Sequence, residues 1–563
     1  MKTYDIFTTD ALSALVPEFL LLCGILVLIL IPNLGKGTFR LPLTQIRIPW
    51  LLGGQRFSMT SHPRIPGILA TLILGVAFVF SLLSQAVDAD VVALKSKGGL
   101  NLLLVDGFSR LFEILFFGAI LAASIASLDR LPVGKGSDSE TLYNNRRQVD
   151  FYILLLTTAL GMSLVALAQD LFILFIGLEL ASLSIYVLVA FHKESKAGTE
   201  AGVKYFIVGS VCSGVGLYGL SLVYLWAGSL QFDVLATAWT SGASTLAILG
   251  MGMILVGFGF KVSAVPFHFA APDAYAGASS PVSAILATAS KAMGMLGLIR
   301  LLVVIAIPEN TDGSALWLVT LGVLSAITMT WGNLAALGTD NPKRMLAYSS
   351  VAHAGYMLAA LTAIGAWKWG HVNAPSDLAG AILGAVLFHL VVLVVFKMGA
   401  FFVLAVLEME GGASRLSNLA GLGKREPLLA AAMFIFMLSL AGVPPLAGFL
   451  SKFLVVAGIV KMAIGDLSAT VAQGEIIGLM DLHWIWWFAL LIFINSAISL
   501  FYYLRIGVVM FFEIPEKERQ KPLPKAPFLR LVIWGCMVGT ILFGIGGDAL
   551  IRLCFNAIEN LSL

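Results

Sequence analysis

Apolar residues fill long stretches of this chain, and short polar connections separate one stretch from the next. A helix needs about 20 apolar residues to cross the roughly 30 Å hydrocarbon core of a bilayer. Counting stretches of that length predicts fourteen transmembrane helices, and therefore an all-α polytopic membrane protein. The stretches lie near residues 13–31, 66–87, 101–126, 150–168, 171–191, 202–227, 245–265, 281–305, 315–337, 345–365, 379–407, 427–460, 484–512 and 528–550.

The two longest polar connections, near residues 32–65 and 127–149, are expected to be surface loops. The first apolar stretch is preceded by the acidic residues Asp5 and Asp10, and no A-x-A cleavage pattern follows it. We therefore expect a retained helix there rather than a signal peptide.

Proline interrupts two of the predicted helices, in GFGFKVSAVPFHFAAPD (257–273) and SLAGVPPLAGFLSKF (439–453). Proline removes a backbone donor and clashes with the preceding turn. Irregular backbone survives at membrane depth only where it faces protein or water. An ordinary proline kink is the alternative for either break alone. Each break also lies close to a lysine, Lys261 or Lys452, and this coincidence favours a transport site.

The two breaks lie five predicted helices apart, in the seventh and twelfth, which predicts two five-helix repeats. An odd number of helices per repeat gives the two copies opposite topology, as in many secondary transporters. The predicted parts are an N-terminal three-helix segment (1–149), a first repeat (150–305), a second repeat (306–513), and a loop with a last helix (514–563).

Composition agrees with a membrane protein. Of 563 residues, 59% are hydrophobic and 12% charged, whereas soluble domains carry about 25% charged residues. The net charge of +3 gives no reason to expect nucleic acid. No Walker loop, haem site or iron–sulfur ligand pattern is present, so ATP hydrolysis and electron transfer within the chain are unsupported. The four cysteines have no metal-ligand spacing and are interpreted as inert thiols: Cys23, Cys212, Cys536 and Cys554.

Basic residues collect on alternate connections, for example at Arg130, Arg147, Lys193, Lys343 and Arg425. Lysine and arginine favour the cytoplasmic side of a membrane. These connections are therefore predicted to be cytoplasmic, and both termini are predicted to lie on the outer side. The membrane expected is the bacterial inner (cytoplasmic) membrane.

Charged residues also lie inside or against the apolar stretches, where an unpaired ion costs several kcal/mol. Such residues usually face protein or water and mark an ion path. This placement makes the chain a candidate translocator of protons or cations. The residues are Glu179, Lys204, Lys261, Lys291, Lys397 and Lys452.

Glu179, in FIGLELASLSIYVL, and Lys204, at the start of the next helix, are predicted to form an ion pair. Pairing lowers the desolvation cost of both groups and couples their titrations. The pair is interpreted as a switch, and a static pair that locks two helices is the alternative.

Lys261, Lys291 and Lys452 have no adjacent acid in the sequence. Burial disfavours the charged form of a lysine, so such a residue can gain and lose a proton as a relay requires. Lysine side chains near a surface can reach water instead. Lys291 lies about ten residues into its stretch, too deep to do so easily.

Three histidines extend this pattern, because imidazole titrates near neutral pH. His268 follows Lys261 by seven residues, across the first break, and is a candidate to pass protons to Lys291. His353 is a second candidate, and a structural role is the alternative for both. His389 lies eight residues before Lys397, about two helical turns away on the same face, so it too could join the row.

Four stretches resemble a known family: EAGVKYFIVGS, GFGFKVSAVPFHFAAPDAYAG, NPKRMLAYSSVAHAGYML and AGLGKREPLLAAAMFIFMLSLAGVPPLAGFLSKF. The family is the antiporter-like subunits of respiratory complex I. Within it the chain is most similar to subunit N, whose homologues include mitochondrial NADH dehydrogenase subunit 2 and the corresponding membrane subunit of the photosynthetic NDH complex. The matching stretches span about 150 to 455.

The resemblance implies fourteen helices in two inverted five-helix repeats. It implies that Glu179 and Lys204 form the input pair, and that Lys261 and His268 lie on the broken seventh helix. On this basis protons would enter from the cytoplasmic side near Lys204 and Lys261 and then pass His268.

In the same family the lysine of the eighth helix matches Lys291, and the lysine after the double proline matches Lys452, the expected exit to the outer side.

The sequence departs from the family pattern at two places. Residues 275–279 read YAGAS where many members read YEGAP, so one acidic residue is absent. Lys397 stands where many members carry an uncharged residue, and is either an extra proton site or a charge that shifts the central row.

The function implied is that of a proton-translocating membrane subunit of a complex I type NAD(P)H or ferredoxin:quinone oxidoreductase. The resemblance implies no cofactor in this chain and places NAD(P)H or ferredoxin, iron–sulfur clusters and quinone on partner subunits. The expected partners are further antiporter-like subunits, small membrane subunits and the lipid bilayer. The alternatives are an Mrp-type cation/proton antiporter subunit and a structural scaffold. The long motifs favour the first function, and the unpaired lysines argue against a scaffold.

Overall fold

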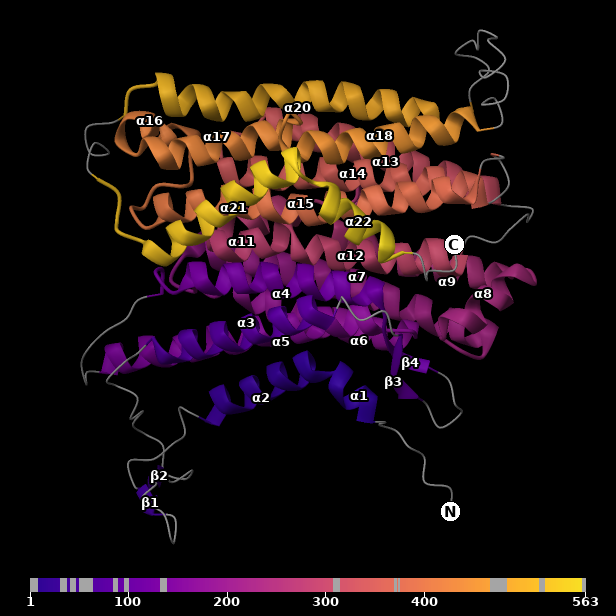
Figure 1. Ribbon diagram of the computed structural model, residues 1–563, viewed down its shortest axis with the longest axis horizontal. Helices are drawn as coiled ribbons and strands as arrows, with labels where there is room; N and C mark the ends of the chain where they lie inside the picture. The colour runs from indigo at the N-terminus through magenta and orange to yellow at the C-terminus, as the bar shows by residue number, and fades with distance from the viewer. Residues whose placement is uncertain are drawn as a thin grey trace.

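The computed structural model describes residues 9–30, 38–40, 47–49, 64–84, 90–95, 101–131, 139–306, 314–368, 372, 375–465, 483–515 and 522–558. Most of these residues lie in helices that pack side by side (Figure 1). Within this part of the chain, 12 helical segments are long and apolar enough to cross a membrane. A helical polytopic membrane protein is therefore confirmed, while the count of fourteen crossings stays a prediction.

The N-terminal part contains two short antiparallel hairpins that the apolar pattern does not predict. Residues 101–105 form a strand where a helix over 101–126 is expected. The helix begins only after Asp106, whose side chain accepts a hydrogen bond from the Ser109 backbone N–H. The Asp106 backbone N–H donates in turn to the Ser109 hydroxyl, which completes a capping box. The elements are α1 (Thr9–Ala14), α2 (Val16–Leu30), β1 (Thr38–Arg40), β2 (Arg47–Pro49), α3 (Ile65–Ser84), β3 (Val91–Lys95), β4 (Asn101–Val105) and α4 (Gly107–Ser127).

The next part, residues 139–306, consists mainly of helices joined by short connections. It begins earlier than expected, because helix already forms within the stretch 127–149 that the sequence predicts to be a loop. The elements are α5 (Ser139–Leu167), α6 (Leu171–Val189), α7 (Lys196–Ala227), α8 (Phe232–Thr240), α9 (Thr245–Val262), α10 (Ala271–Gly277), α11 (Ser280–Ala287), α12 (Ala289–Ile299) and the π-helix η2 (Arg300–Ala306).

The remaining part is also helical. Its elements are α13 (Ser314–Leu337), α14 (Pro342–Lys368), α15 (Ser376–Glu408), η3 (Leu416–Leu419), α16 (Leu422–Arg425), α17 (Pro427–Ala441), α18 (Ala447–Ile464), α20 (Trp486–Phe512), α21 (Pro527–Ile545) and α22 (Asp548–Asn556).

Both proline-containing segments interrupt helices, as predicted. Ser263, with φ 58°, follows α9, and residues 264–270 separate it from α10. Gly442, with φ 87°, follows α17, and residues 443–446 separate it from α18. A positive φ is uncommon for a residue other than glycine. The chain therefore leaves helical geometry sharply at both positions.

A third break lies where the sequence predicts one continuous helix over 281–305. Thr288 (φ −126°, ψ −85°) separates α11 from α12, and its hydroxyl donates to the Ala284 carbonyl at 2.6 Å. Such a bond from threonine to the preceding turn often accompanies a bend in a helix. The break lies three residues before Lys291.

Helices α2 and α20 lie at opposite edges of the bundle, and α21 and α22 cross in front of α15 (Figure 1). The segments 280–305 and 377–408 are the most completely buried of the membrane-length helices. A polar side chain on either of them is shielded from lipid by protein. These two segments carry Lys291, His389 and Lys397.

Candidate functional site

Lys261 occupies the last turn of α9, immediately before the first break, and only 4% of it is exposed. Its ammonium group donates to two hydroxyls of α6, Ser182 Oγ at 2.5 Å and Tyr186 OH at 3.0 Å. It also lies 5.0 Å from the centre of the Tyr186 ring. The chain thus supplies this lysine with neutral partners and a cation–π contact.

The predicted pair of Glu179 and Lys204 is not formed. Glu179 accepts a hydrogen bond from Ser213 of α7 at 2.6 Å, whereas the Lys204 side chain is 48% exposed and pairs with Glu200 (2.6 Å) and Asp273 (3.1 Å). Ser213 and Lys204 are nine residues apart on α7, which corresponds to about 13 Å along the helix. A lysine side chain does not span that separation, so the expectation of a direct pair was wrong.

Glu179 lies instead on α6, the helix whose Ser182 and Tyr186 hydroxyls accept hydrogen bonds from Lys261. The exposed Lys204 shares Asp273 with Arg344, whose guanidinium lies 2.5 Å from the carboxylate. Asp273 belongs to α10, directly after the first break. It therefore joins the break to α7 and α14, a role that the sequence alone did not indicate.

Lys291 is 1% exposed, and its Nζ atom has no hydrogen-bond partner among the described residues. His268 is half-buried, and its ring packs edge-on against Trp331 at 6.2 Å. Its Nδ1 atom likewise has no partner in the described part of the chain. No hydrogen bond joins His268 to Lys261 or Lys291 within that part, so a relay through this histidine stays a prediction.

Lys397 lies in the middle of α15 and is fully buried. Its Nζ atom donates to Ser350 Oγ of α14 at 2.8 Å, and Ser350 Oγ in turn donates to the Ala287 carbonyl at 3.2 Å. Ala287 is the last residue of α11, beside the third break and four residues from Lys291. Lys397 is thus connected to the part of the bundle that holds Lys291.

Two histidines and a serine form a linked set next to Lys397. His353 Nδ1 and His389 Nε2 lie 3.0 Å apart, and His389 Nδ1 lies 2.9 Å from Ser451 Oγ. The two imidazole rings stack with their centres 5.1 Å apart. Proton transfer needs heavy atoms about 2.6–3.2 Å apart, and both contacts meet that requirement. Ser451 is followed directly by Lys452.

Lys452 lies in the first part of α18, beside the second break, and is 8% exposed. Its ammonium group donates to the carbonyls of Leu440 (2.9 Å) and Ala441 (3.3 Å), at the end of α17. The last carbonyls of a helix have no partner within the helix and carry the negative end of its dipole. The break therefore creates the site that holds this cation.

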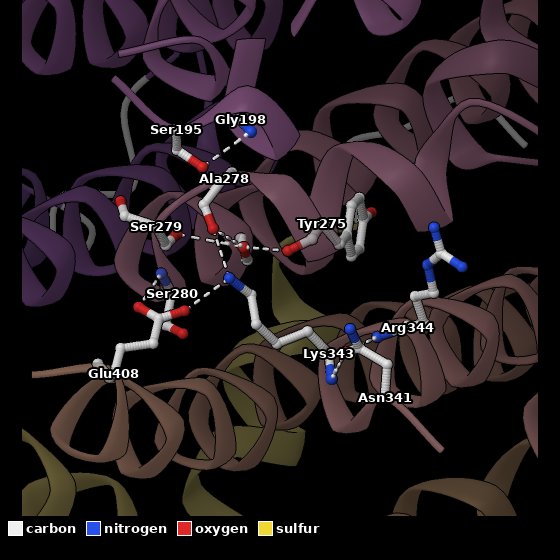
Figure 2. Close-up of polar contacts among 12 residues, drawn as sticks. Ser195, Gly198, Tyr275, Ala278, Ser279, Ser280, Asn341, Lys343, Arg344 and Glu408 are labelled. Atoms are coloured by element: carbon white, nitrogen blue, oxygen red, sulfur yellow. Dashed lines mark hydrogen bonds and ion pairs between the residues drawn. The ribbon is translucent and has the colours of Figure 1, made fainter. Parts of the chain in front are cut away.

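A second group of charges surrounds Glu408, the last residue of α15 (Figure 2). Its carboxylate accepts hydrogen bonds from Lys343 Nζ at 2.6 Å and from the Ser280 backbone at 3.0 Å, and it also pairs with Arg130. Lys343 additionally donates to the Ala278 carbonyl. Sequence reasoning placed Lys343 only among the loop cations, and no pattern in the sequence pointed to Glu408.

A metal centre is not indicated in the described residues, where no three or more His, Cys, Asp or Glu side chains come together. The four cysteines are unpaired with one another. What the described residues offer is a buried set of lysines, histidines and hydroxyls at three helix breaks. This set suits the uptake and transfer of protons.

Known proteins share both the sequence and the fold. Residues 168–478 match the family described as NADH:quinone oxidoreductase/Mrp antiporter, TM. The chain is 37% identical over 460 residues to NADH-quinone oxidoreductase subunit N of Desulfitobacterium hafniense, covering 81% of this chain and 85% of the relative. It is 34% identical over 468 residues to F(420)H(2) dehydrogenase subunit N of Methanosarcina mazei, covering 81% and 84% of the two chains.

Among solved structures, a chain of respiratory complex I from Thermus thermophilus with bound Aureothin is 28% identical and superposes with a TM-score of 0.68. The superposition covers 95% of this chain and 98% of that chain. The family match spans more than half of the sequence and includes the three helix breaks and every lysine of the buried set. The chain therefore belongs to the NADH:quinone oxidoreductase/Mrp antiporter transmembrane family.

Proposed function

We propose that this chain is the proton-translocating subunit N of a complex I type oxidoreductase. The observation that carries the proposal is the linked set His353, His389 and Ser451, which ends beside Lys452 at the second break. Lys397 adjoins the set through Ser350, on the same helix as His353. A scaffold of static ion pairs would place carboxylates on these lysines, yet Lys397 and Lys452 donate to a hydroxyl and to backbone carbonyls.

The chemistry of the chain's own residues is proton uptake, transfer and release. Electron transfer would belong to partner subunits that carry iron–sulfur clusters, quinone and a donor such as NAD(P)H or ferredoxin. The proposed partners are other antiporter-like subunits and small membrane subunits. We further propose that the complex lies in the bacterial inner membrane, with both termini of this chain on the outer side.

The proposed direction runs from the first break to the second. Protons would enter from the cytoplasmic side near Lys261, continue through Lys291 and Lys397, and leave by Lys452. The similar positions of the two breaks support two inverted repeats, 150–305 and 306–513, as the framework of this path. Glu179, on the helix that holds Lys261, would set the affinity of the first lysine for a proton.

The test is the number of protons moved per electron in the purified complex reconstituted into liposomes. Lys261→Ala and Lys452→Ala should each lower that number while the complex still assembles and transfers electrons. Lys461→Ala is the matched control, because Lys461 lies on α18 with Lys452 but is exposed. A full proton count in both buried-lysine variants would contradict the path. Exchange of Na⁺ for H⁺ without electron transfer would support an Mrp-type antiporter instead.

A further inference from the structure

A second buried group of ionisable residues lies outside the lysine row, on α2, α4 and α5. Glu18 is 8% exposed, Arg110 4%, and Glu113 and Ser163 are fully buried. The proposed proton path uses none of them. Two carboxylates and a single guanidinium in one buried place would leave a net charge of −1, which is costly away from water.

The hydrogen bonds around Ser163 define the arrangement. Ser163 Oγ contacts Glu18 Oε1 and lies 3.0 Å from Glu113 Oε1. The other oxygen of Glu113 accepts from Arg110 Nη1 at 2.5 Å and from Ser81 Oγ at 3.3 Å. The other oxygen of Glu18, Oε2, is buried and has no hydrogen-bond partner among the described residues.

The two contacts of Ser163 Oγ with Glu18 and Glu113 require two protons, but only one is present if both carboxylates are ionised. A serine hydroxyl carries one proton and donates one hydrogen bond, and an ionised carboxylate only accepts. Ser163 therefore satisfies one of its two carboxylate contacts, and the other requires a proton on a carboxyl. Glu113 has Arg110 as its counterion, whereas no basic side chain of the described residues lies within 4.0 Å of Glu18. The extra proton belongs on Glu18.

This assignment satisfies every contact in the group. Glu18 donates from Oε1 to Ser163, Ser163 donates to Glu113, and Glu113 remains ionised opposite Arg110. Oε2 of Glu18 is then a neutral carbonyl oxygen, for which the absence of a donor costs far less than for a carboxylate oxygen. The group becomes electrically neutral when the proton is bound.

Backbone carbonyls and a small apolar cluster lie next to this group. Arg110 Nη2 donates to the Ala14 carbonyl at 2.5 Å, and Ala14 packs with Leu103 and Leu167 in a small apolar cluster that includes the β3–β4 hairpin. On the inner side, Arg300 donates to the Ala166 carbonyl at 2.8 Å, three residues after Ser163. Arg300 is the first residue of η2, which follows α12, the helix that carries Lys291.

We propose that Glu18, Ser163 and Glu113 form a buried proton-binding site that is separate from the lysine row. Its ligand is a single proton, held on Glu18 and hydrogen-bonded to Ser163. Binding the proton changes the charge of the site from −1 to 0. The site does not depend on the proposed path, because its occupancy is a property of these three side chains and Arg110.

Infrared spectroscopy of the purified complex tests the site without any transport measurement. Wild-type protein at neutral pH should show the carbonyl stretch of a protonated carboxylic acid that shifts in D₂O, and Glu18→Gln should lose this band. Glu194→Gln is the matched control, since it adds the same amide group at a side chain that is 60% exposed and paired with Arg147. Its spectrum should keep the band.

Ser163→Ala provides a second infrared test, in which both carboxyl groups remain present. The band should remain in this variant but change its frequency, because the proton on Glu18 loses its acceptor. Identical spectra of the wild type, Glu18→Gln and Ser163→Ala in this region would show that Glu18 is ionised and overturn the proposal. If Glu18→Gln does not assemble, an unchanged band in Ser163→Ala is sufficient to overturn it. A full proton count in the buried-lysine variants, with this band intact, would contradict only the proposed path.

Discussion

Lys397 on α15 and Ser350 on α14 are joined by a hydrogen bond of 2.8 Å, although 47 positions separate them in the sequence. Both residues are fully buried. The ammonium group therefore has a hydroxyl as its partner and no carboxylate within ion-pairing distance among the described residues. A lysine held this way can lose its proton without leaving an opposite charge unpaired, which supports the proposal that Lys397 belongs to the row.

Replacing Lys397 by methionine should stop transfer through the row, since methionine keeps much of the side-chain volume but binds no proton. We expect fewer protons moved per electron in proteoliposomes, with electron transfer retained. Ser350→Ala should have a smaller effect of the same kind, because losing a hydrogen bond to a charged group costs about 1.5–3 kcal/mol. Lys424→Met, at an exposed lysine, is the control. Normal pumping in Lys397→Met would remove this residue from the path.

The contacts of Glu179 and Lys204 predict which pairs of substitutions have non-additive effects on stability. Lys204→Met and Asp273→Asn should be non-additive in the thermal stability of the complex, because the two side chains lie 3.1 Å apart. Lys204→Met and Glu179→Gln should be additive, as expected for residues without shared partners. Since Lys204 is about half exposed, solvent screens the pair and the coupling with Asp273 should be small but measurable. A coupling of Lys204 to Glu179 larger than that to Asp273 would restore the pair expected from the sequence.

Removing the carboxylate of Glu408 should destabilise the protein strongly. Glu408→Ala leaves Lys343, which is 3% exposed, without its counterion. Breaking a buried ion pair in this way costs about 3–5 kcal/mol. The double variant Lys343→Met with Glu408→Gln should recover part of the loss, because no unpaired lysine remains. Thermal unfolding of the purified complex measures both effects.

The matched control is the exposed pair of Arg505 and Asp340, whose atoms lie 2.6 Å apart. Asp340→Ala should change stability by no more than about 1 kcal/mol, as is usual for surface ion pairs. Equal losses of stability in Asp340→Ala and Glu408→Ala would show that burial does not strengthen the contribution of the Glu408 ion pair.

Gly442 is expected to tolerate no side chain. Its φ of 87° lies in the left-handed region, and a methyl group added there would lie 3.3 Å from Lys452 Cδ. Gly442→Ala should therefore lower stability by about 1 kcal/mol or more and reduce pumping by displacing Lys452. Gly75→Ala is the control, because a methyl group at Gly75 meets no atom within 4 Å. Alanine there should be neutral or slightly stabilising within the helix.

The apolar pattern correctly located most helices, since a membrane-length run of apolar residues has few other stable conformations in a bilayer. Proline also located the first two breaks. The break at Thr288 escaped prediction because the sequence ILATASKAMG contains neither proline nor a glycine at that point. The Thr288 hydroxyl does bond to the preceding turn, but the same bond occurs at Thr362 within the continuous helix α14, so it could not have located the break.

Which charges lie in the interior could be predicted, whereas the partners of those charges could not. Lys261 and Lys452 are buried as expected, because a charge inside an apolar run has to face protein. The partner of each lysine depends on which helices face one another, and no short-range pattern records this. Asp273 and Ser350 lie far along the chain from the lysines they contact, and the predicted partner of Lys204 was wrong for this reason.

Glu408 contacts Arg130 from the N-terminal part, Ser280 at the start of α11, and Lys343 on α14. One end of α15 is thus clamped to three other segments, and Lys397 lies 11 residues away, about 16 Å along the same helix. A continuous helix transmits displacement along its axis with little loss. Any partner that pulls on one of the three clamped segments would therefore act mechanically on a buried lysine that it never touches.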